Sequence, residues 1–390
     1  MIPLKREVAP YFQPIVSIHN QRIYGYETLG RRIRVGGVES LGAFFKDPDV
    51  ADELHLQIDR DLREKAIKKL AAAKNDASLF INLKPSWIYS TYKQSGILTT
   101  LQILKKYNID PSRLVIEITE EEFTGQLQEL IEIVELYRQE GCTIAIDDVG
   151  SGFSNFDRIA SLQPKILKID LNIIKKSATH AGYKALMQSF SILSAQMGSS
   201  LLVEGIETKQ DLQNALHAGA RYVQGFLFSK AIPEFQEASV YRKMLKEEME
   251  QFSQEEFDRY RRLFAVQESL NHLVDSPVTI RSSEDADHVI ERTLTTITDT
   301  CIRIYICRGD GYQVSSNYQC REDGVWSKDE TFRGANWIWR PYFIPNILMM
   351  NNQRQGILSQ IYTDLDRARL IQTFSCPLSN GYYLFLDLTI

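Results

Sequence analysis

The sequence predicts an α/β fold: a (β/α)8 TIM-type barrel with an antiparallel first strand, joined by a long helix to a smaller α+β domain. Three observations predict this class. Short β-rich runs alternate with amphipathic helical segments over about the first 240 residues. Near-continuous apolar strands between helices indicate parallel pairing with both faces covered. At about residue 235 the composition changes, and a charged stretch without Gly or Pro leads into a third region.

The candidate strands of the barrel are eight in number, which is the number that closes such a fold. They are FQPIVSI from Phe12, RIYGYETLG from Arg22, SLFINL from Ser78, RLVIEIT from Arg113, TIAIDDV from Thr143, KILKID from Lys165, SLLVEGI from Ser200 and YVQGFLF from Tyr222. Only IHNQ separates the first two. Such a gap is too short for a crossover, so these two strands are expected to pair as an antiparallel hairpin.

The segments between the strands show helical spacing. In QELIEIVELYRQEG, the apolar residues Leu130, Ile133, Val134 and Tyr137 recur on one helical face, and Gly141 supplies a stop. After the barrel, residues 238–274 carry many Glu, Lys and Arg with apolar positions between them, which predicts one long helix or two in succession. We therefore expect a barrel over residues 1–238, a helical linker over 239–276 and a second domain over 277–390.

The second domain is predicted to be a mostly antiparallel sheet with flanking helices. One helix is expected near residues 284–298 and another at PNILMMNNQ. Strands are expected at IRIYIC, GYQVSS, LSQIYTDL, LIQTFSCPL and YYLFLDLTI.

The composition excludes several classes of function. A net charge of -5 argues against binding to the nucleic-acid backbone, so no DNA partner is expected. The five cysteines form no CxxC pair, which is typical of reduced thiols in a cytoplasmic protein. The histidines lack zinc-site spacing. No signal peptide and no apolar run long enough for a membrane span are visible.

Polar or ionisable residues stand at seven successive strand ends. They are Glu27, Asn82, Glu117, Asp147 with Asp148, Lys168, Glu204 with Glu207, and Gln224. Barrel active sites gather at this carboxyl-terminal rim. Acids on apolar strands are costly unless they are paired or bind a metal. Each residue taken singly could be a helix cap or an ion-pair partner, but the whole set favours an active site.

The chemistry of this set favours hard cations. Carboxylate and amide oxygens suit Mg²⁺ or Mn²⁺ rather than zinc. Adjacent Asp147 and Asp148 could serve two ions, one of them shared. Two metal ions about 3.5–4 Å apart stabilise both the attacking and the leaving oxygen of a phosphoryl displacement.

Eight motifs in order resemble the EAL-domain family: YFQPI, ETLGR, FINL, IEITE, DDVGSGFSN, LKID, VEGIET and VQGFLF. The resemblance covers about residues 8–235. It implies a barrel with an antiparallel first strand and hydrolysis of cyclic di-GMP to linear 5′-pGpG. It also implies two ions, Mg²⁺ or Mn²⁺, whereas Ca²⁺ is expected to permit binding and inhibit hydrolysis.

The resemblance implies a role for each matching residue. One ion would be held by Glu27, Asn82, Glu117 and Asp147, and the other by Asp147, Asp148 and Glu204. Lys168 would orient or activate the attacking water, Gln224 would order the site, Glu120 would tie down the loop after Asp148, and Glu207 would support the metal ligands. Gln13, Leu29 and Arg31 would contact the ligand, with Arg31 near a phosphate. Alternatively, Arg31 is a surface charge beside Arg32.

Three positions depart from the family pattern. Thr28 replaces an Ala of the name motif, and Ser151 replaces a Thr but keeps the hydroxyl. Val149 replaces a Phe in the loop that positions the second ion. Because small misplacements can cost about 100-fold in rate, the alternative function is a catalytically weak or inactive receptor that binds cyclic di-GMP and signals by conformational change.

The region from about residue 278 resembles a PAS/Cache-type sensor domain, as in firmicute EAL proteins with two domains. Such a domain would regulate the barrel. Trp339, Arg340, Tyr342 and Asp364 could line a pocket for a small polar ligand. Alternatively, WIWRPYF simply packs against the sheet edge.

Apolar residues of the long helical segment also predict a homodimer. Met244, Phe252, Tyr260 and Phe264 would leave an apolar stripe in water if the helix were alone. In the competing arrangement this stripe packs back on the chain's own barrel.

Overall fold

The computed structural model describes residues 3–119, 126–150, 156–177, 179–272, 278–297, 300–321, 323–340, 342–364 and 370–389. The chain divides into two compact units, Met1–Phe252 and Ser253–Ile390, and each is described by itself. The boundary falls within helix α10 (Arg242–Asn271). None of the helices in the described ranges is both long enough and apolar enough to cross a membrane.

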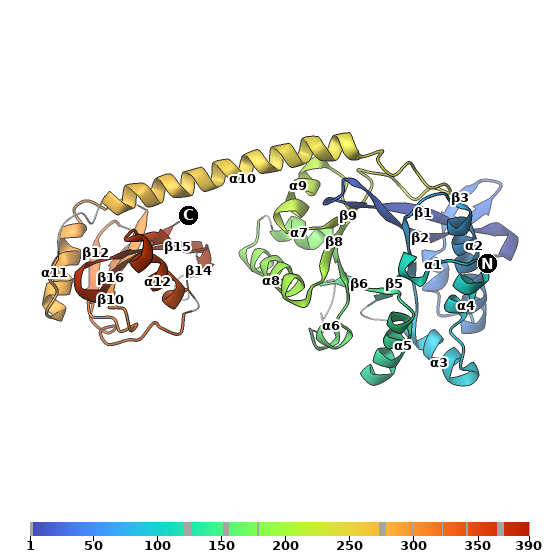
Figure 1. Ribbon diagram of the computed structural model, residues 1–390, viewed down its shortest axis with the longest axis horizontal. Helices are drawn as coiled ribbons and strands as arrows, with labels where there is room; N and C mark the ends of the chain where they lie inside the picture. Colours follow the sequence, from blue (N-terminus) through green and yellow to red (C-terminus); the bar gives the residue numbers. More distant parts are fainter. Residues whose placement is uncertain are drawn as a thin grey trace. The chain divides into compact units, whose positions relative to one another are not determined.

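The first unit is a closed barrel, as predicted (Figure 1). Its strands are β1 (Val8–Ser17), β2 (Arg22–Arg34), β4 (Ser78–Asn82), β5 (Leu114–Thr119), β6 (Thr143–Val149), β7 (Ile166–Asp170), β8 (Ser200–Glu204) and β9 (Tyr222–Gln224). Their order is β1-β9-β8-β7-β6-β5-β4-β2, and the pairing of β1 with β2 closes the ring. Strand β1 is antiparallel to both neighbours, which confirms the expected hairpin. Strand β3 (Gly37–Ser40) pairs with β2 outside the ring.

Helices follow the strands around the outside of the barrel (Figure 1). They are α1 (Gly42–Phe45), α2 (Asp52–Ala72), α3 (Pro85–Ser95), α4 (Thr99–Lys106), α5 (Leu127–Gln139), α6 (Phe156–Leu162), α7 (Leu171–Ser177), α8 (Ala181–Met197) and α9 (Lys209–His217), with short 3-10 turns at Lys5–Glu7 and Pro111–Arg113. In α5, the predicted face of Leu130, Ile133, Val134 and Tyr137 is buried. Gly141 then adopts a φ of 100°, a left-handed conformation that suits glycine after a helix.

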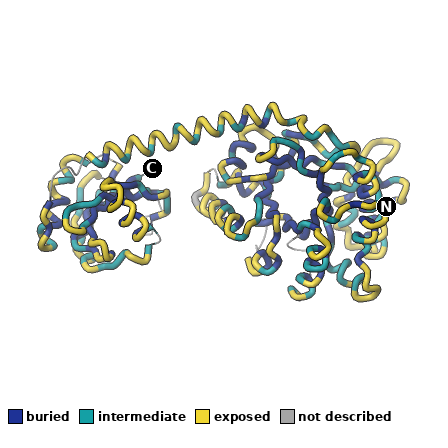
Figure 2. Tube along the Cα trace, viewed as in Figure 1, coloured by how far each residue is buried: buried dark blue, intermediate teal, exposed yellow. Residues whose placement is uncertain are grey.

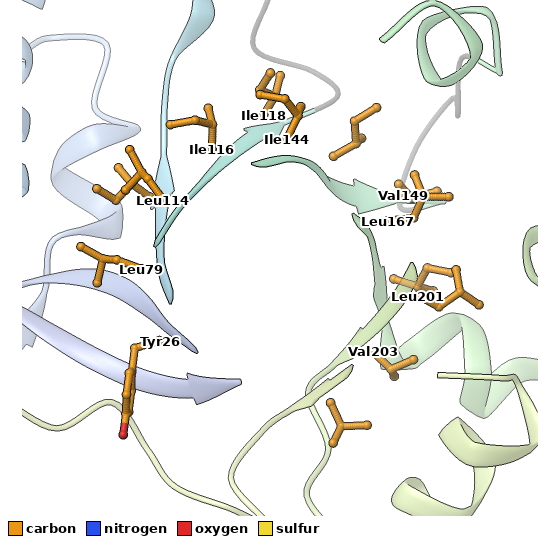
Figure 3. Packing of buried hydrophobic residues seen from close by; sticks show 14 of the residues in the cluster. Tyr26, Leu79, Leu114, Ile116, Ile118, Ile144, Val149, Leu167, Leu201 and Val203 are labelled. Atoms are coloured by element: carbon orange, nitrogen blue, oxygen red, sulfur yellow. The ribbon is translucent and has the colours of Figure 1, made fainter. Parts of the chain in front are cut away.

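Alternation along the strands divides the apolar residues into two layers. Side chains such as Leu79, Leu114, Ile116, Leu201 and Val203 point away from the ring of strands (Figure 3) and belong to the core shared with the helices. The intervening positions point inward and form a second buried cluster, made of Ile15, Phe80, Val115, Ala145, Ile166, Leu202 and Tyr222. The barrel strands are therefore buried on both faces, whereas the surrounding helices expose their outer faces (Figure 2).

The second unit is an antiparallel sheet with helices on both faces, which confirms the predicted α+β class. Its elements are α11 (Ser283–Thr293), β10 (Cys301–Arg308), β11 (Asn317–Cys320), β12 (Trp326–Asp329), α12 (Phe343–Gln353), β13 (Ile357–Leu358), β14 (Tyr362–Thr363), β15 (Leu370–Pro377), a 3-10 turn at Ser379–Gly381 and β16 (Tyr382–Thr389). The strand order is β12-β11-β10-β16-β15-β13, with β14 paired to β15. Because strand residues alternate, Ile304 and Ile306 share one core cluster with α11, whereas Tyr305 and Cys307 share another with α12.

The prediction of a strand at GYQVSS is wrong. Only isolated bridges occur there, at Tyr312 and Gln313, and regular pairing begins at Asn317. The reason is local: Ser315 Oγ accepts a hydrogen bond from the Ile306 amide at 2.8 Å, and the amide of Ser316 donates to Asp287 at 2.7 Å. Serine side chains that bond nearby backbone groups compete with strand pairing in this way.

Helix α10 is a single long helix, one of the two predicted forms. Leu245 is buried in the core of the first unit and Leu270 in the core of the second. The expected apolar stripe is divided. Met244 and Phe252 pack against the core of the first unit, while Tyr260 and Phe264 are exposed.

Candidate active site

On the inner face of the barrel, each parallel strand changes from an apolar residue to a polar residue near its carboxyl end. Along the parallel strands, the polar residue follows an inward apolar residue by two positions: Asn82 after Phe80, Glu117 after Val115, Asp147 after Ala145, Lys168 after Ile166, Glu204 after Leu202, and Gln224 after Tyr222. A spacing of two keeps each polar side chain on the inner face. Strand β1 runs the other way, so Gln13 precedes Ile15. The predicted rim set is thereby brought to one end of the barrel.

Lys168 stands at the centre of this set. Its side chain is fully buried, and Nζ lies 2.6 Å from Glu117 Oε1, 2.9 Å from Glu204 Oε1 and 3.1 Å from Asp147 Oδ1. Glu27 Oε2 is 3.9 Å from the same nitrogen. Four carboxylates from four strands thus surround one ammonium group, and they exceed it in charge.

Burial and charge act against each other in this cluster. Desolvation disfavours the charge on Lys168. The attraction of the four surrounding carboxylates outweighs this effect and holds the Lys168 pKa well above its usual value. Burial raises the pKa of Glu117 and of Glu204 well above the ordinary range. Burial acts the same way on Asp147, but Lys168 and hydrogen bonds to its carboxylate overcome it and leave the Asp147 pKa lowered. The surrounding carboxylates therefore favour the charged form of Lys168.

The carboxylates of this cluster are incompletely satisfied. Both oxygens of Glu117 and Oε1 of Glu204 are buried and have no hydrogen-bond partner among the described residues. Their contacts with Lys168 are short enough for ion pairs but are not aligned as hydrogen bonds. Buried acceptors without donors are costly unless a cation completes them.

The donor set fits divalent cations by its chemistry. Hard carboxylate oxygens in excess of positive charge are the ligands that such ions prefer. In the described ranges, however, no three acidic, histidine or cysteine side chains are arranged as a ready-made metal site. The Lys168 ammonium stands where three of the carboxylates converge.

Amide side chains hold the carboxylate of Glu27. Asn82 Nδ2 donates to Glu27 Oε1 at 3.2 Å, and Gln224 Nε2 donates to Glu27 Oε2 at 2.6 Å. Because the Asn82 amide group donates through its nitrogen, its carbonyl oxygen remains the atom that could bind a cation. Gln13 lies directly across from Glu27 in the β1–β2 hairpin and accepts from Gln224 Nε2 at 3.2 Å.

Asp148 is placed differently from Asp147. It has a φ of 57°, its side chain is exposed, and its backbone amide donates to Asp147 Oδ1 at 2.9 Å. Burial raises the pKa of Asp148, and the neighbouring charge of Asp147 adds to this. Val149, the departure from the family pattern, is fully buried and pairs with Ile169 of β7. Residues 151–155 of the following loop lie outside the described residues.

The predicted ligand contacts form a line on β2. Glu27, Leu29 and Arg31 alternate on one face of the strand, and Arg31 is half-buried, which lowers its pKa. Tyr11 was not among the predicted ligand contacts. It lies directly across from Leu29, and the Arg31 guanidinium stands 6.0 Å from the centre of its ring. Its spacing of two from Gln13 on β1 was the signal that could have identified it.

One predicted residue lies apart from the cluster. Glu207 is exposed near the start of α9, where its backbone amide bonds Asp211, so the structure does not place it beside the carboxylates. Glu120 lies outside the described residues.

The residues predicted to line a pocket in the second unit have separate surroundings. Trp339 is exposed, with the Arg340 guanidinium 4.5 Å from the centre of its ring. The ring of Tyr342 stacks on Tyr362 at 5.7 Å. Asp364 is buried and pairs with Arg303.

Comparison with known proteins places these features in a family. Residues 3–231 match the EAL domain, and residues 235–390 match an EAL-domain associated signalling protein domain. The chain is 35% identical over 388 residues to the uncharacterized EAL-domain containing protein YkuI of Bacillus subtilis, covering 98% of this chain and 94% of YkuI. The crystal structure of YkuI in complex with substrate c-di-GMP and calcium has a TM-score of 0.90 at 34% identity and covers 99% of this chain and 97% of that one.

Two further relatives share the barrel alone. The probable cyclic di-GMP phosphodiesterase PdeA of Escherichia coli is 30% identical over 230 residues, which are 57% of this chain and 30% of PdeA. The cyclic di-GMP phosphodiesterase RocR of Pseudomonas aeruginosa is 27% identical over 233 residues, which are 58% of each protein. With the barrel, the rim cluster and a family match over more than half of its length, the chain belongs to the EAL domain family.

Proposed function

We propose that this chain hydrolyses cyclic di-GMP to linear 5′-pGpG in a reaction that depends on divalent metal ions. The observation that carries the proposal is the rim cluster, where four carboxylates exceed one buried ammonium group and three carboxylate oxygens lack hydrogen-bond partners in the described ranges. Relatives named as cyclic di-GMP phosphodiesterases and the c-di-GMP complex of YkuI support the choice of substrate.

The metal ligands of the proposal are those of the sequence analysis. Glu27, Asn82, Glu117 and Asp147 would hold one ion, and Asp147, Asp148 and Glu204 the second. Two ions, Mg²⁺ or Mn²⁺, would supply Lewis-acid activation of water and neutralise charge on the phosphate when bound. Ca²⁺ is expected to support binding without turnover.

The chain's own residues supply positioning and a fixed positive charge. Lys168 would orient or activate the attacking water, and the carboxylates around it hold its pKa above its usual value. In its charged form, Nζ would orient the attacking oxygen by hydrogen bonding and offset the charge that develops at phosphorus. In the net reaction, water adds its oxygen to one phosphorus, the P–O3′ bond breaks, and a proton reaches the leaving 3′ oxygen.

Substrate would be held along the inner face of the β1–β2 ribbon. Arg31 is a planar donor suited to a phosphate, and Leu29 and Tyr11 offer an apolar and aromatic surface for a base. These residues continue the line of Glu27, so a ligand bound there would reach the carboxylate cluster.

The test is turnover of cyclic di-GMP by the purified chain in Mg²⁺, Mn²⁺ or Ca²⁺, with product followed by chromatography and binding by calorimetry. We expect pGpG in Mg²⁺ or Mn²⁺ and binding alone in Ca²⁺. Asp147→Asn should lower turnover by at least about 100-fold, as loss of a major electrostatic group does, whereas Glu140→Gln at an exposed helix end should not change it. Undiminished hydrolysis by Asp147→Asn would refute the metal assignment.

The alternative is a receptor that binds cyclic di-GMP without turnover. It is favoured by Val149, which replaces the Phe of the family pattern in the loop that positions the second ion. Tight binding in Mg²⁺ and Mn²⁺ with no pGpG after prolonged incubation would establish the receptor and exclude the hydrolase.

We also propose that the second unit regulates the barrel as a PAS/Cache-like sensor, in line with its match to an EAL-associated signalling domain. A small polar ligand near Trp339, Arg340, Tyr342 and Asp364 remains part of this proposal. Replacing Trp339 by Ala, which removes an exposed ring, should alter the ligand's effect on turnover without altering turnover in its absence.

A homodimer through α10 completes the proposal. Phe257, Tyr260 and Phe264 are 62%, 49% and 64% exposed and follow one another by three and four positions, so they share one helical face. A second copy would cover this face, because exposed apolar patches of this kind normally mark an interface.

Light scattering tests the dimer. The parental chain should have the mass of a dimer, and the double variant Phe257→Asp, Phe264→Asp should have that of a monomer. Arg262→Asp, on the opposite face of the same helix, should remain dimeric. A parental monomer at micromolar concentration would exclude this interface.

A further inference from the structure

A chain of amide groups leads from the rim cluster to the backbone beyond β9. Gln224 Nε2 donates both to Glu27 Oε2 at 2.6 Å and to Gln13 Oε1 at 3.2 Å. Gln13 Nε2 in turn donates to the carbonyl oxygen of Ser229 at 3.1 Å. Two amide side chains, Gln224 and Gln13, therefore connect a carboxylate of the cluster to one backbone oxygen.

The direction of this chain is determined at its far end. A backbone carbonyl can only accept hydrogen bonds, so Gln13 must turn its NH2 group toward Ser229 and its oxygen toward Gln224. Gln224 must then present its own NH2 group to Gln13 and to Glu27. The orientation of both amides, which shape alone does not determine, follows from acceptors at the two ends of the chain, the Ser229 carbonyl and the Glu27 carboxylate.

The Ser229 carbonyl is itself held in place. The amides of Phe228 and Ser229 both donate to the carbonyl of Gly225, which makes a tight turn after β9. Gly225 is required there, because a Cβ atom would collide with the backbone of Ile206. Further along, Phe12 and Ile232 exchange backbone hydrogen bonds of 2.7 and 3.1 Å, which fasten this segment to β1. Backbone hydrogen bonds therefore hold the chain both before and after Ser229.

We propose that Gln13 is a positioning residue for the metal ligand Glu27, acting through Gln224 from an anchor at the Ser229 carbonyl. The proposal rests on the metal-dependent function in one respect, the assignment of Glu27 as a ligand. With the chain intact, the Glu27 carboxylate is presented in one orientation. Without it, a buried carboxylate loses a charge-assisted donor and can rotate away from the cation.

Affinity for Mn²⁺ in the absence of cyclic di-GMP tests the proposal, measured from the electron paramagnetic resonance of free Mn²⁺. Gln224→Met keeps the side-chain length but removes the amide, and should weaken Mn²⁺ binding about 10–100-fold, as loss of a group that orients a metal ligand does. Gln13→Met should weaken it by about threefold to tenfold, the effect of one buried hydrogen bond. The double variant should bind as Gln224→Met does, because Gln13 acts through Gln224. Gln102→Met, at an exposed glutamine on α4, should bind as the parent.

Unchanged Mn²⁺ affinity in Gln13→Met, with weaker binding of cyclic di-GMP, would overturn the proposal and make Gln13 a ligand contact alone. Multiplying losses in the double variant would also overturn it, because the two residues would then act separately. Circular dichroism checks the fold of each variant, and Gln13→Asn, one methylene too short to span the gap, repeats the test if Gln13→Met does not fold. Failure of the parent to hydrolyse cyclic di-GMP while binding Mn²⁺ would refute the hydrolase only.

Discussion

Each unit of the molecule buries a cation among carboxylates, and the two sites differ in how completely they are closed. In the second unit, Arg303 bonds both oxygens of Asp364, at 3.1 and 3.3 Å, and Asp387 Oδ2 at 3.1 Å. Thr373 donates to the remaining oxygen of Asp387 at 2.6 Å. In the barrel, Lys168 faces four carboxylates, and three of their oxygens have no hydrogen-bond donor among the described residues.

The difference distinguishes an ion pair that only stabilises the fold from one whose carboxylate oxygens can still bind a ligand. Arg303 has a planar fork of donors that can satisfy two carboxylates at once, whereas Lys168 is a point charge. The Arg303 site is closed, so it contributes rigidity and offers no acceptor to a ligand. The Lys168 site is open, so its carboxylate oxygens remain available to a cation, as the proposed function requires.

Lys168→Ala should have the largest effect. Turnover of cyclic di-GMP is expected to fall by three to four orders of magnitude, or about 4–5.5 kcal/mol in barrier height, because the variant lacks the charge that orients the attacking water. Affinity for cyclic di-GMP should stay within about tenfold. Steady-state kinetics together with calorimetry measure both. A large loss of affinity with turnover per bound ligand unchanged would contradict the role given to Lys168.

Arg303→Met should have the next largest effect, and on stability alone. It leaves Asp364 and Asp387 uncompensated, which is expected to destabilise the second unit by about 3 kcal/mol. Denaturant unfolding followed by tryptophan fluorescence reports on this unit, because it carries Trp326, Trp337 and Trp339.

The matched control for Arg303 lies on the same strand. Arg308 is exposed and forms an ion pair with nearby Asp310, so Arg308→Met should cost less than about 1 kcal/mol. Equal losses in the two variants would show that the Arg303 site is not the closed structural cluster described above.

Glu117→Gln should have a smaller effect on stability than Arg303→Met, and its sign should be favourable. Burial raises the Glu117 pKa in the folded chain. The folded state therefore binds this proton more tightly than the unfolded state does, and this carboxyl group's contribution to stability falls as pH rises above its ordinary range. Glutamine does not titrate, so the variant should gain about 0.5–2 kcal/mol at neutral pH while losing turnover.

Thermal unfolding between pH 4 and pH 8 measures this gain. The difference between Glu117→Gln and the parent should be small at the acid end and should grow with pH, whereas Glu140→Gln should show no such trend. A variant that is less stable than the parent at neutral pH would mean that neighbouring donors satisfy the Glu117 carboxylate, as they satisfy that of Asp387.

Most of the barrel and much of its site could be predicted from local pattern. The period of two places Glu117, Asp147 and Lys168 on the same side of their strands as the inner apolar layer, and parallel strands bring their carboxyl ends to one rim. The short gap before Arg22 requires a hairpin, and β1 and β2 form one. These features depend on neighbours in sequence, which is why the sequence by itself determined them.

Contacts between residues far apart in sequence depended on closure of the ring of barrel strands. Gln13 and Ser229 are separated by 216 positions, and they meet because β1 is inserted between β9 and β2. No periodicity relates such residues, so the amide chain from Glu27 to Ser229 depended on the tertiary structure. A side chain's face follows from local geometry, whereas its partners depend on which distant backbone the closed fold brings within hydrogen-bonding distance.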